Sequence, residues 1–265
     1  MPRANRYFLP SYIYHITHRC HNKDFHLKFS KDKKVYLKWL FEAKKRFGLS
    51  ILNYVIMSNH IHLLVHSNSQ NVISDSMHLI AGASGQAFNK RKNRQGAYWQ
   101  DRYFATAIQS NKHFIQCLAY IDLNPVRAGI ASLPKEYEYS AYHEIRNAKS
   151  KHQYIAHQAL VKLSGIGSME SLISEIDKTI HLKLKKNLNQ KESFWSDSLA
   201  VGDENFLAKF IDHLGTKSKF KDIDKINTGQ SIVKEKPQDY GDQSGLSNAF
   251  PLDLPFYPTK GHLKP

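Results

Sequence analysis

Two histidines, His60 and His62, are separated by a single isoleucine in a run of apolar and β-branched residues. In a β-strand, residues i and i+2 point to the same face, so both imidazoles would face the same way. Imidazole is a common ligand of divalent metal ions. The pair therefore indicates a two-histidine metal site that needs a third ligand, although a chain with 15 His also contains such pairs for packing alone.

The segment that follows Leu118 offers that ligand and a nucleophile. On a helix, Tyr120 and Asn124 are four residues apart and share a face, opposite the apolar positions. Tyrosine hydroxyls form covalent intermediates in some enzymes, but a tyrosine in this pattern is more often a core or interface residue. Because Pro125 biases Asn124 away from helical geometry, the spacing by itself leaves both roles open.

The hydrophobic periodicity predicts the elements that must position these residues. Ser30 is a plausible helix start and Gly48 a plausible helix end, and the short break at Ser58 and Asn59 predicts a hairpin. The predicted elements are strands at 11–18, 51–57, 60–66 and 103–108, and helices at 30–47, 73–94 and 114–121. Strands and helices intermingle without regular alternation, which favours an α+β domain on an antiparallel sheet.

Three regions are predicted along the chain. A catalytic-sized domain covers residues 1–150, and helical periodicity at 172–180 and 203–215 predicts a small helical extension over 151–216. Residues 217–265 are polar and are predicted to form a poorly ordered tail.

Composition limits the class of protein. Two cysteines cannot build a disulfide framework, the first residues lack a secretory apolar stretch, and no window approaches the length of a membrane helix. The sequence therefore predicts a cytoplasmic protein without a membrane span.

Positive charge is concentrated in the first region. The whole chain has a formal net charge of +15, and residues 1–150 alone hold 22 Lys and Arg against 9 Asp and Glu. A basic surface attracts phosphate backbones through counterion release, without specifying a sequence. This half of the chain is therefore the candidate for binding nucleic acid and, in the cell, for association with the nucleoid.

Several blocks of residues resemble one known family. They are Met57–Leu64, Ala97–Tyr103 and Tyr120–Gly129, with weaker blocks at Met1–Tyr7, Tyr14–Cys20 and Ser196–Gly202. In this order they are similar to the REP-associated tyrosine transposases, the single-tyrosine branch of the enzymes with a His-hydrophobic-His motif. The resemblance spans roughly residues 1–145, with Ser196–Gly202 similar to the extension of longer members. Ser58 stands where many relatives have proline.

The resemblance implies a fold, a reaction and a role for each matching residue. The fold would be a ferredoxin-like antiparallel sheet with helices on one face. Tyr120 would be the nucleophile, His60 and His62 metal ligands, and Asn124 the third ligand. The family's tyrosine attacks single-stranded DNA beside a hairpin and forms a 5′-phosphotyrosine link. Two imidazoles suit Mn²⁺ better than the strictly oxygen-loving Mg²⁺, and either divalent ion is compatible with the set.

Basic and aromatic residues near these blocks are predicted to bind DNA. A charge run is usually a solvated face, but here it stands beside aromatic residues that could stack on unpaired bases. The candidates are Arg3, Arg6, Arg19, Lys90, Arg91, Lys92, Arg94, Trp99 and Arg102.

Two other functions compete with a transposase. A non-catalytic DNA-binding regulator would keep the fold and the basic surface, but it would not need Tyr120 or the ligand set. A metallohydrolase that uses activated water would leave Tyr120 unexplained. The sequence also leaves open whether the chain is a monomer or a homodimer.

Overall fold

The computed structural model describes residues 8–147, 154–186, 192–215, 221–227 and 230–235. Its first half has the element order β1 (Ile13–Arg19), α1 (Ser30–Phe47), β2 (Ser50–Ile56), β3 (His60–His66), α2 (Val72–Lys92) and β4 (Phe104–Ile108). These strands lie in the order β2-β3-β1-β4, and each neighbouring pair is antiparallel. This strand-helix-strand-strand-helix-strand unit is ferredoxin-like. The α+β class and the 58–59 hairpin are confirmed.

Local sequence explains where these elements end. α1 stops at Gly48, whose φ of 71° lies in the left-handed region that glycine adopts without steric cost. α2 ends in the same way at Asn93, with φ 46°. α3 (Lys112–Asp122) and the short helix α4 (Asn124–Arg127) meet at Leu123, and Pro125 occupies the first turn of α4.

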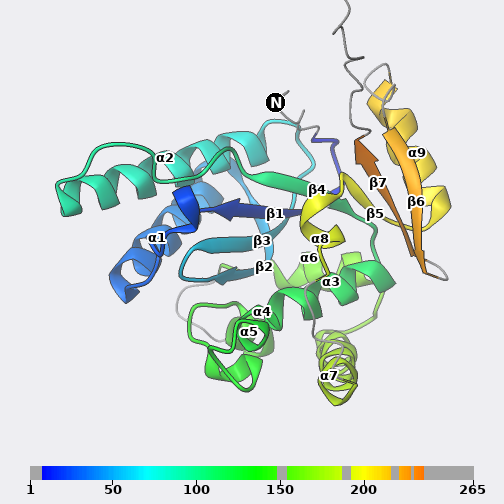
Figure 1. The fold of residues 1–265 in the computed structure, drawn as a ribbon. Helices are drawn as coiled ribbons and strands as arrows, with labels where there is room; N and C mark the ends of the chain where they lie inside the picture. Colours follow the sequence, from blue (N-terminus) through cyan, green and yellow to red (C-terminus); the bar gives the residue numbers. More distant parts are fainter. Residues whose placement is uncertain (1–7, 148–153, 187–191, 216–220, 228–229, 236–265) are drawn as a thin grey trace, which may run out of the picture.

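The two helices of the ferredoxin-like unit lie on one face of the sheet, as predicted, and further helices cover the second face. On one face His18 stacks on Trp99, and Trp99 donates a hydrogen bond to the Ala81 carbonyl of α2. His15 points the opposite way because it is three residues from His18 in the same strand, and its ring faces Tyr120 of α3. α1 and α2 therefore pack on one face, as in the ferredoxin-like unit, and α3 packs on the other (Figure 1).

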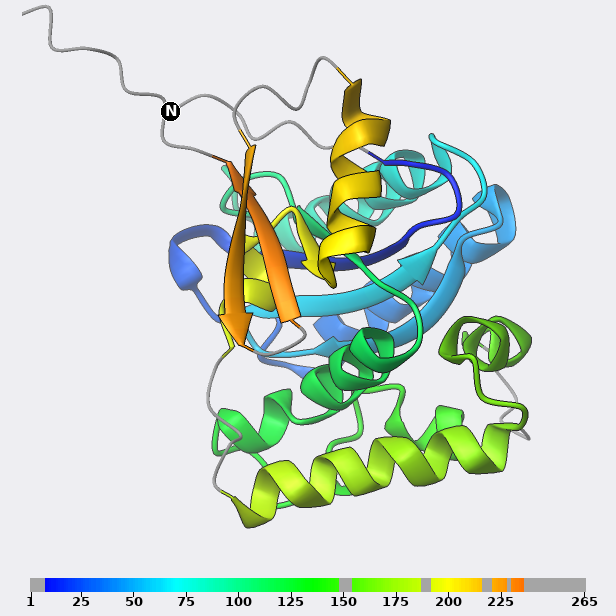
Figure 2. The same cartoon turned by 90° about the vertical axis from the view of Figure 1, so that its right-hand side faces the viewer.

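The remaining helices extend the second face. They are α5 (Tyr142–Arg146), α6 (His157–Ser164), α7 (Met169–Lys185) and α8 (Phe194–Asp197). α7 contacts α3 and α6, and both views show it beyond α3 from the sheet (Figures 1 and 2). Two short 3₁₀ turns, at His21–Lys23 and Pro134–Glu136, connect other elements.

The C-terminal part extends the same sheet, so it is not only helical as predicted. β5 (Ala200–Gly202) pairs in parallel with β4, and β7 (Gln230–Glu235) and β6 (Lys221–Asn227) continue beyond it. α9 (Glu204–Leu214) lies beside this hairpin (Figure 2). The predicted polar tail thus contains two strands, because β7 pairs with the edge of β5 and buries Ile232 and Val233. Residues 236–265 lie outside the described residues.

No helix in the described ranges combines the length and the apolar character needed to cross a membrane. The core between the layers contains large, fully buried side chains, including Tyr14, Tyr36, Phe114, Tyr120 and Trp195. Two of these, Tyr120 and Trp195, come from α3 and α8 and meet on the same face as His15. That face is where the chemistry-bearing residues gather.

Candidate active site

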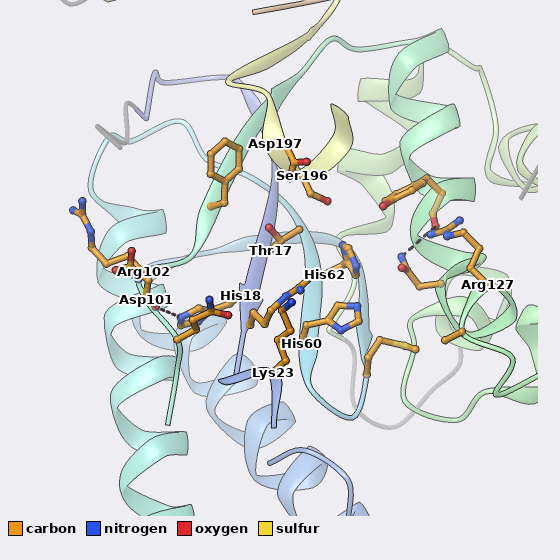
Figure 3. A pocket seen from close by; sticks show the side chains of 17 residues that line it. Thr17, His18, Lys23, His60, His62, Asp101, Arg102, Arg127, Ser196 and Asp197 are labelled. Carbon is orange, nitrogen blue, oxygen red and sulfur yellow. Dashed lines mark hydrogen bonds between the residues drawn. The ribbon is translucent and has the colours of Figure 1, made fainter. Parts of the chain in front are cut away.

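A cavity of about 710 Å³ opens on the α3 face of the sheet. Its floor is formed by β1 and β3, and one wall comes from α3 and α4. α8, far along the chain, borders the cavity with Ser196 and Asp197 (Figure 3). The predicted catalytic and ligand residues all line it: His60, His62, Tyr120 and Asn124. The structure therefore brings the predicted set together within one chain.

The two histidines occupy adjacent positions on one face of β3. Their ring centroids are 5.1 Å apart with planes at 82°, and Figure 3 shows them side by side above Lys23. His62 is buried while His60 is half-buried at the start of the strand. The i, i+2 geometry expected of a strand is confirmed.

Hydrogen bonds determine which nitrogen of His62 can bind an ion. His15 Nδ1 donates to the Trp195 carbonyl oxygen at 2.7 Å, because a carbonyl can only accept. His15 Nε2 must then accept from His62 Nδ1, which lies 2.9 Å away. His62 therefore carries its proton on Nδ1 and presents the lone pair of Nε2. Such an outer partner orients a ligating histidine.

The second histidine is oriented by its sequence neighbour. His60 Nδ1 lies 2.7 Å from Asn59 Oδ1, so with the amide oxygen accepting, the lone pair belongs to Nε2. Asn59 Nδ2 in turn donates to the carbonyl of Lys23 at 3.2 Å. Asn59 thus connects His60 to the loop that follows β1.

Burial keeps His15 and His62 neutral. It lowers the pKa of His15 to about 4, and the pKa of His62 falls well below its ordinary value because of burial and the neighbouring His15 and His60. Neutral imidazole is the form that ligates a metal ion. The donor chemistry of the pair therefore fits a divalent cation.

Asn124 adds an amide oxygen to this set. Its Nδ2 donates to the carbonyls of Tyr120 at 3.2 Å and Ile121 at 3.3 Å, so Oδ1 is the atom left to ligate an ion. No group of three or more His, Cys, Asp or Glu in metal-binding arrangement occurs among the described residues. An ion in this cavity would therefore take its third protein ligand from an amide and further ligands from water or substrate.

Tyr120 faces the same cavity from α3. Its ring centroid is 5.9 Å from that of His62, with planes at 85°, and only 1% of the residue is exposed. Burial raises the pKa of its hydroxyl, while nearby Arg127 and a hydrogen bond with Ser196 lower it. A buried neutral phenol is a weak nucleophile, so reaction at this site requires additional activation.

The sequence analysis missed several residues that complete the cavity. Arg127 stacks on Tyr120, with Cζ 4.1 Å from the ring centroid, and donates to the Tyr120 carbonyl at 2.6 Å. Ser196 and Asp197 approach from α8 on another side (Figure 3). Arg127 and Ser196 lie inside the blocks that carry the family resemblance, which was their only sequence signal. His15 had no signal of its own beyond its position in such a block.

The predicted DNA-contacting residues are distributed unevenly. Arg19 and Arg102 line the cavity, whereas Arg91 forms an ion pair with Asp32 and Arg94 donates to Asn89 and Ala97. Lys90 and Lys92 are both exposed at the end of α2. Arg3 and Arg6 lie outside the described residues.

Trp99 has a structural role in this fold. Its ring stacks on His18 with centroids 3.9 Å apart, and its indole N–H donates to the Ala81 carbonyl at 3.1 Å. The side chain therefore wedges between β1 and α2. DNA contact by Trp99 stays a prediction from the sequence.

Residues 9–124 match the family described as IS200-like transposases. The matched region contains the ferredoxin-like unit and the cavity residues His60, His62, Tyr120 and Asn124, so this part of the chain is similar to a family of DNA-processing enzymes. The resemblance predicted from the sequence blocks is confirmed.

Individual relatives are similar over part of the chain. A protein from Haemophilus influenzae described as a REP-associated tyrosine transposase is 32% identical over 98 residues, which are 33% of this chain and 56% of the relative. The match thus spans about half the length of that relative. A solved REP-associated tyrosine transposase bound to a REP hairpin is 18% identical, with TM-score 0.48, over 58% of this chain and 90% of the other. The structure of a transposase from Deinococcus radiodurans is 18% identical, with TM-score 0.32, over 42% of this chain and 88% of the other.

Proposed function

We propose that this chain cleaves single-stranded DNA beside hairpin-forming repeats and rejoins strands through a covalent bond to Tyr120. The observation that carries the proposal is the placement of Tyr120 and His62 in one cavity of one chain, with the tautomer of His62 set by His15. The similarity to a relative described as REP-associated supports repeat DNA as the substrate.

The reaction is a phosphoryl transfer. Tyr120 Oη attacks phosphorus and gives up its proton, the bond between phosphorus and the 3′ oxygen breaks, and that oxygen takes a proton to become a 3′-OH. The product is a 5′-phosphotyrosine, and a 3′-OH can attack it in the reverse sense. Since one phosphodiester replaces another, strand transfer requires no nucleotide cofactor.

The protein's part is to hold the ion, the phosphate and the phenol in place. His60, His62 and Asn124 would bind Mn²⁺ or Mg²⁺, which when bound polarises the phosphate and offsets the poor reactivity of a buried phenol. Arg127 donates to the Tyr120 carbonyl and lies over the ring, so its remaining N–H groups are placed to contact a phosphate oxygen in the cavity. Arg19 and Arg102 supply further positive charge at the cavity wall.

The test is covalent capture. Purified protein is incubated with Mn²⁺ and a 3′-labelled single strand that contains the repeats flanking its gene, and the label is followed on a denaturing gel. We expect the label to migrate with the protein, and Tyr120→Phe to abolish this adduct while hairpin binding stays nearly unchanged, because only the nucleophilic oxygen is lost.

The rival functions give different results. A metallohydrolase would release a free 5′-phosphate without an adduct, and Tyr120→Phe would still cleave. A non-catalytic regulator would bind the strand and leave it intact with every variant. Either result would reject the proposed function.

A further inference from the structure

A second surface next to the cavity has no part in the chemistry described so far. Phe25 and Phe29 are 64% and 53% exposed, and they are the exposed phenylalanines of the described residues. Both belong to the loop between β1 and α1, which includes the cavity-lining Lys23. We call Phe25 and Phe29 the aromatic platform.

The platform belongs to an anchored loop. Between the two rings, His26 and Leu27 are buried, and the Leu27 N–H donates to the Ser58 carbonyl at 2.9 Å. The His26 ring packs against Phe88 and Tyr98, with centroids 4.8 Å and 5.2 Å away. The backbone is therefore held in place, and the exposed rings are presented by a fixed scaffold.

The charges around the platform favour a polyanion. The exposed Lys23 and Lys28 come from the same loop, and the exposed Lys31 lies in the first turn of α1. Lys92 of α2 places Nζ 5.5 Å from the Phe29 ring centroid. On the acidic side, Asp32 is paired with Arg91, and Asp24 is exposed. Flat rings between lysines are the combination with which proteins hold unpaired nucleotides, because bases stack on the rings while the lysines neutralise phosphates.

We propose that the aromatic platform binds unpaired nucleotides of the single strand that enters the cavity. This inference rests on the proposed function and extends it by naming where the strand continues. Lys23 connects the two surfaces, since it lines the cavity and its carbonyl accepts from Asn59, the residue that orients His60. A strand whose phosphate lies at Tyr120 can thus pass Lys23 and stack on Phe25.

The test measures binding of a fluorescent oligothymidylate, which cannot form a hairpin, by anisotropy at several salt concentrations. Phe25→Ala with Phe29→Ala should weaken binding about fivefold or more with the salt slope unchanged, because stacking releases no counterions. Lys28→Ala with Lys92→Ala should instead make the log-log slope shallower by about 0.7 for each phosphate that the variant no longer neutralises. Phe25→Tyr with Phe29→Tyr should restore wild-type affinity, since the ring is kept.

A control separates the platform from general surface effects. Leu182→Ala removes a side chain of equal exposure to that of Phe29, on α7, and should leave oligothymidylate binding unchanged. Unchanged affinity of the double alanine variant would overturn the proposal, as would a conversion of dimer to monomer on size-exclusion chromatography, which would make the platform a contact between two copies.

The platform and the proposed chemistry fail separately. At saturating DNA the double alanine variant should form the Tyr120 adduct as wild type does. If wild type forms no adduct but its oligothymidylate binding depends on the two rings, the proposed function is wrong and the platform stands. If the adduct forms and oligothymidylate binding does not depend on the two rings, only the proposal for the aromatic platform is wrong.

Discussion

At the scale of single residues, the site depends on which atoms of each side chain are already engaged. Two ring nitrogens and one amide oxygen face the cavity because their neighbouring polar atoms are bonded elsewhere. We expect His60→Ala and His62→Ala each to remove Mn²⁺-dependent adduct formation, and Asn124→Ala to weaken it less, because water can replace a neutral amide. Cleavage at wild-type rates in both histidine variants, measured by the same gel, would locate the ion elsewhere.

His15 has a separate effect that does not require contact with the ion. Its removal leaves His62 Nδ1 without the acceptor that sets its tautomer and ring orientation. His15→Ala should therefore lower Mn²⁺ affinity about 10- to 100-fold, measured by calorimetry on the DNA-free protein. His66→Ala, on the same face of β3, is the matched control and should bind Mn²⁺ as wild type does. An equal loss of Mn²⁺ affinity in both variants would mean that any substitution in these strands disturbs the site, and His15 would then have no specific role.

At the scale of elements, the buried carboxyl group of Glu144 in α5 forms a hydrogen bond with the segment before α6. The Glu144 carboxylate accepts from the Ile155 N–H at 2.8 Å, and Ile155 forms a bridge to Ile51 of β2. Burial raises the pKa of Glu144 above its ordinary value of 4.5. The folded state therefore holds this proton more tightly than the unfolded state.

This difference gives a sign for the pH dependence of stability. The contribution of Glu144 is greatest below the unfolded pKa and is lost as pH rises through the folded pKa. Glu144→Gln keeps an oxygen acceptor but cannot titrate. We expect the free energy of unfolding of wild type minus that of the variant to fall as the pH rises above the ordinary carboxyl pKa of 4.5, measured by urea denaturation. A difference that is constant or rises with pH would contradict the burial of this carboxyl.

At the scale of the whole molecule, one chain supplies the entire cavity. Tyr120 reaches His62 of its own chain, and α8 of the C-terminal part borders the cavity. We expect a mixture of Tyr120→Phe and His62→Ala proteins to form no adduct, because Tyr120 and His62 must belong to the same chain to share one cavity. Restored activity in the mixture would show that the tyrosine acts on the histidines of a second chain. Each variant mixed with wild type serves as the control for inhibition.

The C-terminal part is integral to this arrangement. The Trp195 carbonyl accepts a hydrogen bond from His15 Nδ1, the Ser196 side chain forms a hydrogen bond with Tyr120, and β5 extends the sheet beside β4. α9 also packs on the start of β1, where Tyr12 bonds with His213 at 2.9 Å and contacts Phe206. The described C-terminal segments therefore extend the sheet and help to form the cavity of residues 8–147.

The sequence by itself determined the local elements and the main candidates. Periodicity, glycine at the end of α1 and proline after α3 are local signals, so the strands and helices of the first half followed from them. The shared face of His60 and His62 followed from the period of a strand. Helical spacing placed Tyr120 and Asn124 on one face, and the family resemblance assigned their roles. The placement of all four in one cavity agrees with that analysis.

Only the tertiary structure decided which distant residues complete the site. His15 meets Trp195 across 180 residues, and β5 joins β4 at a sheet edge that no local pattern specifies. Arg91 and Trp99 were predicted to face DNA because charge and aromaticity are visible in sequence, whereas their partners Asp32 and Ala81 are not. Sequence periodicity reports which face of an element is apolar, but the pairing of elements depends on long-range packing. Only the tertiary structure therefore showed that α3 covers the second face of the sheet.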